Sequence, residues 1–137
     1  APGGAARHAG APSLDVECGP VGCDIEAGWV SDGFDNKPLG ARGGGVSAGS
    51  SQFRRKPDGT LEPLPPYGQM VIAEGESVIS YSCGGGGYGP AHEREPEKVR
   101  HDVAEGWITR ERARTAYKVE IGGDGEIDLA ATAALRS

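Results

Sequence analysis

The sequence has few residues that can build a hydrophobic core. Of its 137 residues, 36% are hydrophobic and 6% are aromatic, whereas 24 are glycine and 10 are proline. A chain of this length is expected to form one domain with a modest core that leaves much of its surface in water. Several apolar segments with regular spacing nevertheless argue against general disorder. We therefore expect an irregular, glycine-rich structure that relies on partners for part of its burial.

The sequence also lacks an excess of basic residues and a long apolar run. Its 14 basic and 20 acidic residues give a formal net charge of −6. That charge offers no cationic surface for a phosphate backbone and argues against nucleic acid as a partner. No apolar run approaches the roughly eighteen residues that a membrane helix needs, and the start of the chain has no apolar signal core. We expect a cytoplasmic chain without membrane association.

Three cysteines cannot form a closed disulfide framework, because their number is odd, and reduced thiols are the simpler expectation. Cys18 and Cys23 flank a turn, but structural zinc pairs usually stand about two to four residues apart and need a second pair of ligands. The remaining candidates are scattered along the sequence: Cys83, His8, His92 and His101. We favour burial of small thiols on strands over a zinc site.

Three aspartates, Asp24, Asp32 and Asp35, could gather around a hard cation, but they match no calcium-loop pattern. Solvated turn carboxylates are the favoured interpretation. His92 and His101 stand among Glu and Arg, which indicates an exposed helix face rather than a general base held by a third group. The sequence therefore predicts no metal site, and no set of catalytic residues can be identified from it.

Residues 13–83 predict a mainly β structure with short strands. Apolar and polar residues alternate at 14–18 and 23–30, residues 52–55 and 61–64 flank a hairpin turn, and residues 70–73 and 77–83 are expected to form two more strands. Turns are expected at Gly19-Pro20, Pro57-Asp58-Gly59 and Glu74-Gly75-Glu76. Residues 31–51 are expected to form a long loop, and residues 64–67 an extended, polyproline-like edge. Residues 1–12 are expected to be a flexible arm.

Residues 90–137 predict a small α+β tail with two or three short helices. Pro96 suits the first position of one helix, which Gly106 ends. Thr109 can cap a second helix, and Asp128 can cap a third over 129–136. Between them, residues 118–121 and 126–127 flank Gly-Gly-Asp-Gly as a hairpin.

The run Gly84–Gly89 follows a strand and precedes a helix, which is the setting of a phosphate-binding loop. No Gly-Lys-Ser/Thr follows the run, and no βαβ unit surrounds it. A backbone path too crowded for any Cβ explains the glycines without a ligand. The shorter run Gly43–Gly45 is interpreted in the same way, so no cofactor site is predicted on this chain.

The order of residues after the glycine run resembles the closing signature of the hydantoinase B, oxoprolinase and acetone carboxylase family. The matching positions are Gly84–Gly89, Arg94-Glu95-Pro96-Glu97, Val99 with Asp102-Val103, Gly106 with Ile108-Thr109, and Ala113 with Tyr117. Upstream, Val30–Gly33, Lys37–Gly40 and Pro57–Gly59 extend the resemblance to roughly residues 20–135. Family members are several times longer, so the chain resembles only their C-terminal region.

Three positions depart from this family pattern. Gly89-Pro90-Ala91 stands where Gly-Asp-Pro is usual, and Glu95-Pro96 replaces the more frequent Asp-Pro. Lys118 follows the tyrosine where a glycine is common. These differences affect the expected detail of local loops.

The resemblance implies a small, mainly structural subunit of an ATP-dependent ketone carboxylase of the acetophenone or acetone type, inactive by itself. It implies large hydantoinase A-like and hydantoinase B-like partners, with ATP and a divalent metal on the partners. One alternative within the family is a complex that opens a hydantoin, oxoproline or other lactam. Two further hypotheses do not depend on this role: the chain is a free-standing binding module, or it is a fragment of a longer protein.

Overall fold

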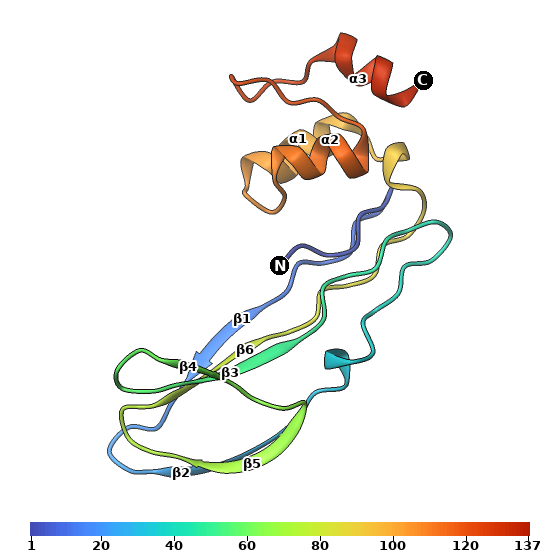
Figure 1. Ribbon diagram of the computed structural model, residues 1–137. Helices are drawn as coiled ribbons and strands as arrows, with labels where there is room; N and C mark the ends of the chain where they lie inside the picture. The colour runs from blue at the N-terminus through green and yellow to red at the C-terminus, as the bar shows by residue number, and fades with distance from the viewer.

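The strands and the helices of this chain lie at opposite ends of the molecule (Figure 1). The computed structural model describes residues 1–137, and extended, glycine-rich segments connect the two ends. The mainly β fold with a small helical tail, predicted from the sequence, is confirmed. None of the three α-helices has the length and apolar character required to cross a lipid bilayer.

The six strands form two antiparallel sheets. They are β1 (Asp15–Cys18), β2 (Ile25–Val30), β3 (Ser51–Arg55), β4 (Leu61–Pro63), β5 (Tyr67–Ile72) and β6 (Ser77–Tyr81). One sheet has the order β1-β6-β3-β4, and the other pairs β2 with β5. All six predicted strands are present, but β5 begins at Tyr67, earlier than expected, because this residue pairs with Val30.

The two sheets arise from one long antiparallel ribbon that bends. Cys18 pairs with Val78 in the first sheet, and Ile25 pairs with Ile72 in the second. At the bend between them, the Glu74 carboxylate accepts from the Gly22 amide at 3.0 Å, and the Glu74 amide donates to Asp24 at 2.9 Å. The turns at Gly19-Pro20 and Glu74–Glu76 therefore carry strands from one sheet to the other, whereas the turn at Pro57–Gly59 closes the predicted hairpin between β3 and β4.

The middle of the molecule is a bundle of extended backbone from the N-terminal residues and the two glycine runs. Gly4 donates to Gly85 at 2.9 Å, Gly45 donates to Ala5 at 2.7 Å, and Gly87 donates to Gly45 at 3.0 Å. Ala6 is fully buried. The structure thus differs from the flexible arm expected for residues 1–12, since backbone hydrogen bonds, which composition does not reveal, join that segment to both runs.

The predicted helices of the tail are confirmed at α1 (Pro96–Ala104), α2 (Arg110–Tyr117) and α3 (Leu129–Arg136). The Thr109 hydroxyl accepts from the Arg112 amide at 3.1 Å, and the Asp128 carboxylate accepts from the Ala131 amide at 2.9 Å, so both predicted caps are present. The hairpin expected around residues 122–125 has no strands and contains one isolated antiparallel β-bridge, between Ile121 and Ile127.

Residues 31–50 form the long loop predicted over 31–51, since Ser51 already belongs to β3, and the loop contains one short 3₁₀ turn, η1 (Asp32–Phe34). A second 3₁₀ turn, η2 (Ala91–Glu93), precedes α1. Pro65 and Pro66 lie between β4 and β5, outside both strands.

The chain buries little of its surface. Only 18 of 137 residues are buried, and the one cluster of packed apolar residues lies in the tail: Val99, Ala113, Tyr117, Val119 and Ile121. The accessible surface is 8070 Å², whereas a compact monomer of this mass is expected to expose about 6,700 Å². Large apolar side chains such as Val30, Leu39 and Tyr67 are more than two-thirds exposed. This surface is suited to contact with further protein.

Candidate functional site

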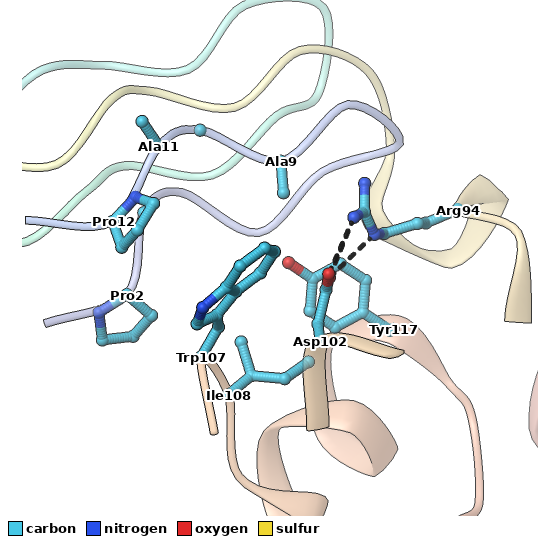
Figure 2. Close-up of a pocket in the computed structure, with 11 residues that line it drawn as sticks. Pro2, Ala9, Ala11, Pro12, Arg94, Asp102, Trp107, Ile108 and Tyr117 are labelled. Atoms are coloured by element: carbon cyan, nitrogen blue, oxygen red, sulfur yellow. Dashed lines mark hydrogen bonds and ion pairs between the residues drawn. The ribbon is translucent and has the colours of Figure 1, made fainter. Parts of the chain in front are cut away.

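A cavity that contains a buried ion pair lies where the N-terminal segment meets the helical tail (Figure 2). The cavity has a volume of about 180 Å³. Pro2, Ala9 and Pro12 line one side, and Trp107 and Ile108 line the other. The remaining side chains are Arg94, Asp102 and Tyr117. The site therefore depends on residues from both ends of the sequence.

The ion pair between Arg94 and Asp102 is the main electrostatic feature of this cavity. The Arg94 Nη2 atom lies 2.9 Å from Asp102 Oδ2, and the Arg94 Nε atom donates to the same oxygen at 3.1 Å. The side chains are 14% and 6% exposed. Arg94 Nη1 also donates to the carbonyl of Arg7 at 3.3 Å. The pair thus ties the start of the tail to helix α1 and to the N-terminal segment.

Tyr117 closes the base of the cavity and is 1% exposed. Burial raises the pKa of Tyr117, and the positive charges of Arg94 and Arg112 only partly oppose this effect. Its phenol therefore stays protonated at neutral pH and cannot act as a general base.

Helix α3 is joined to this region through its last residue. The Arg136 guanidinium donates to the carbonyls of Arg94 at 2.7 Å and Tyr117 at 3.2 Å. From the other side, Arg112 donates to the carbonyl of Gly3 at 3.0 Å. Every cationic group at the site is thus engaged with backbone carbonyls or with a carboxylate, which is the pattern of a structural junction.

The tail residues that match the family signature have structural roles. Arg94 and Asp102 form the buried pair, Ala113 and Tyr117 belong to the core, and Thr109 caps α2. Gly106 has the left-handed φ of +72° that ends α1. The departure at Lys118 falls on the left-handed cap of α2, with φ of 58°. A glycine suits that conformation better, because a Cβ is strained there.

The glycine runs are packing elements, as predicted. A Cβ at Gly84 would lie 2.8 Å from the carbonyl oxygen of Ala11, and one at Gly87 would overlap the Cβ of Ala6. The amides of Gly85 and Gly87 already donate to carbonyls within the chain. Those two amides are therefore not available to a phosphate. A Cβ at Gly44 would overlap the carbonyl of Gly87, so the run Gly43–Gly45 serves the same packing.

The expected burial of the two neighbouring thiols is wrong. Cys18 and Cys23 are both exposed, because they flank the bend where the ribbon leaves the first sheet, and Cys83 is half-buried. Among the histidines, His8 lies beside Tyr88 and His101 beside Trp107, with ring centroids 6.2 and 5.7 Å apart.

The remaining candidate ligands lie apart from one another. His92 and His101 are exposed, as predicted. Asp24, Asp32 and Asp35 are exposed turn residues, also as predicted, and Asp32 accepts a hydrogen bond from Asn36 at 2.8 Å. No three His, Cys, Asp or Glu side chains are grouped as a metal ion would require.

Sequence reasoning did not identify the buried pair or its contact with the N-terminal segment. Arg94 and Asp102 are eight positions apart, and only Asp102 lies within a helix. A buried carboxylate in a helix that is otherwise polar has no distinctive sequence signal. The resemblance marked both residues without indicating what they do.

Comparison with known proteins finds relatives that are named as subunits of enzymes. The chain is 38% identical over 109 residues to a Pseudomonas sp. (strain NS671) protein of the hydantoinase B type, named for a D-/L-hydantoinase, covering 77% of the chain and 18% of the relative. It is 44% identical over 68 residues to the caprolactamase beta chain of Pseudomonas jessenii, covering 50% of the chain and 12% of the relative. It is 37% identical over 67 residues to the acetophenone carboxylase delta subunit of Aromatoleum aromaticum (strain DSM 19018 / LMG 30748 / EbN1), covering 47% of the chain and 10% of the relative.

The fold is also found in a solved structure. The crystal structure of an ATP-dependent caprolactamase from Pseudomonas jessenii superposes with a TM-score of 0.71 and 27% identity, covering 98% of this chain and 24% of the other. No protein-family model matches the chain. The chain spans less than a fifth of the length of each curated relative it matches.

Proposed function

Because the chain belongs to the hydantoinase B and oxoprolinase family, of whose subunits it represents the C-terminal part, we propose that it is a structural component of an ATP-dependent enzyme complex. Its relatives are subunits of hydantoinase, caprolactamase and acetophenone carboxylase. In this role the chain supplies a folded end to a larger hydantoinase B-like body and performs no chemistry itself.

The observation that carries this proposal is the structural use of the family signature. Arg94 and Asp102 neutralise each other in a buried pair, and Tyr117 is a buried neutral phenol. Each residue stabilises the junction between the N-terminal segment and the tail. A catalytic set would instead present a nucleophile or base to a space that a substrate can enter.

The exposed surface supports assembly with larger partners. The chain exposes about a fifth more surface than a compact protein of its mass, and apolar side chains contribute to that excess. We propose hydantoinase A-like and hydantoinase B-like subunits as the partners. ATP and its divalent metal are then held by a partner, since the amides of Gly85, Gly87 and Gly89 in the glycine run already donate to carbonyls within the chain.

For the reaction of the complex, we propose ATP-dependent opening of a cyclic amide. The hydantoinase relative aligns over the longest part of the chain, and the caprolactamase structure covers nearly all of it. Carboxylation of a ketone with bicarbonate, which the sequence resemblance favours, is the second candidate and is supported by the acetophenone carboxylase relative.

Native pull-down of the chain from its source organism tests the assembly. We expect large hydantoinase A-like and B-like subunits to be recovered with it, and recovery of the chain alone would refute the proposal. Gly87→Ala is expected to reduce recovery, because the new Cβ would overlap Ala6. Gly123→Ala is the matched control, because nothing lies within 4 Å of a Cβ there.

The purified complex then distinguishes the two reactions. Cyclic amide opening predicts lactam-stimulated ATP hydrolysis that does not require bicarbonate. Ketone carboxylation predicts stimulation by a ketone only when bicarbonate is present. Stimulation by the ketone and bicarbonate together, with no response to any lactam, would refute the first reaction and support the second.

A further inference from the structure

A second cavity, of about 220 Å³, lies between the two sheets of the β part. Its walls are mostly apolar and include Ile25, Ala27 and Trp29 of β2, Ile72 of β5 and Val78 of β6. The side chains of β2 alternate, so these three residues all face the four-stranded sheet. The space exists because Ala27 is small where its neighbours on this face are large.

Trp29 forms a fixed wall of this inter-sheet cavity. Its indole Nε1 donates to the carbonyl of Pro65 at 2.9 Å. The ring lies against Gly68, its cross-strand partner, where a Cβ would be 2.7 Å from the ring. Since the ring is held at its nitrogen and packed along its edge, it cannot swing inward to fill the space. The cavity is therefore built into the packing of the two sheets.

One polar side chain in the lining lacks a partner. Gln52 of β3 is 9% exposed, and its Oε1 atom is buried without any hydrogen bond. Leaving a buried acceptor unpaired is costly, so an acceptor of this kind calls for an explanation. An O–H or N–H donor inside the cavity would supply the missing hydrogen bond.

We propose that the inter-sheet cavity binds a small, mostly apolar ring compound that donates one hydrogen bond to Gln52. The space has a volume of about 220 Å³ and is open to solvent beside Cys18, and because an enclosed cavity of about 150 Å³ accommodates benzene, it has room for a ring of phenol size. The apolar walls take the ring, and the Gln52 amide oxygen takes the donor. This inference is independent of the proposed function, because it concerns occupancy of the β part and no reaction.

Alkylation of Cys18 provides a direct test. Cys18 lines this cavity, whereas Cys23 does not, and both thiols are exposed. The full chain, in the assembly in which it is purified, is treated with iodoacetamide at increasing phenol concentrations, and both thiols are followed by peptide mass spectrometry. Phenol is expected to slow alkylation of Cys18 in a saturable way, with roughly millimolar affinity for so small a ligand, and to leave Cys23 unaffected.

Toluene tests the hydrogen bond, since it matches phenol in size and has no donor. Phenol is expected to bind about two- to tenfold more tightly than toluene, the ratio that one net hydrogen bond gives. In Gln52→Met, which introduces an apolar side chain of similar length, the two ligands are expected to bind equally. Ala27→Leu is expected to fill the cavity and abolish protection by both.

Four results would each overturn the proposal, three of which concern protection of the thiols. The first is the absence of saturable protection of Cys18 by phenol, and the second is equal protection of Cys23. The third is undiminished protection in Ala27→Leu. If Gln52→Met folds and retains the preference for phenol, Gln52 is not the acceptor and the proposal also fails.

Discussion

Replacing Asp102 by leucine should strongly destabilise the chain at the tail junction. The substitution keeps the branched shape of the side chain but leaves the Arg94 guanidinium buried without its carboxylate. Removing one partner of a buried ion pair costs about 3–5 kcal/mol. Since the two side chains are 14% and 6% exposed, water screens this loss only weakly. Against a total stability of about 5–15 kcal/mol, that loss is a large fraction.

A double-mutant cycle identifies the cause of that loss. Arg94→Met alone should cost a similar amount, because it leaves the Asp102 carboxylate buried and unpaired. Replacing both partners by apolar groups is often nearly neutral, so the double variant should cost at most about 2 kcal/mol, far less than the sum of the single changes. The two substitutions should therefore show a coupling of at least about 4 kcal/mol.

Urea unfolding of the full chain, followed by the fluorescence of Trp107, measures these differences, because Trp107 lies in the wall of the same cavity. Trp29→Phe in every variant removes the second tryptophan signal. Additive single effects would refute the interpretation of a coupled buried pair. A cost below about 1 kcal/mol for Asp102→Leu would show that the pair is effectively solvated.

Three further changes test the local structure of the tail. Lys118→Gly should stabilise the chain by about 1 kcal/mol, because Lys118 holds a left-handed φ of 58° that strains a Cβ; a loss of stability in thermal unfolding would contradict this. Thr109→Ala should cost about 1 kcal/mol through loss of the cap on α2, whereas Thr109→Ser should cost little, and equal costs would argue against capping. The raised pKa of Tyr117 predicts stability that is fully present below about pH 10, the ordinary tyrosine value, and is lost as the pH rises toward the folded-state pKa. Tyr117→Phe should show a weaker decline over that range, and an unchanged profile would exclude this tyrosine as the cause.

Most secondary structure in this protein could be predicted from local sequence. Thr109 and Asp128 cap helices because their side chains reach amides within the next turn, and that geometry is set by residues three positions apart. Gly106 ends α1 because only glycine enters the left-handed region at little cost. The alternation from Leu14 to Val30 likewise indicates strands, since successive side chains point to opposite faces.

The pairing of the strands depended on the tertiary structure. The turn around Gly75 suggests a hairpin between its flanking strands, yet β5 pairs with β2 and β6 pairs with β1 and β3. Residues 1–12 similarly contain no sign that Gly4 and Ala5 hydrogen-bond to residues 85 and 45. Such contacts join positions about 40 to 80 residues apart, and the spacing of neighbouring residues carries no information about them.

The sequence by itself determined where the helices and strands form and which family the chain resembles, because both depend on residue order within short segments. The tertiary structure alone decided what the marked residues do. It shows that the motif residues Arg94 and Asp102 form a buried ion pair. It also shows that the glycine run packs in the centre of a bundle of extended backbone. The physical reason is that burial and charge pairing depend on distances across the fold, which local sequence does not specify.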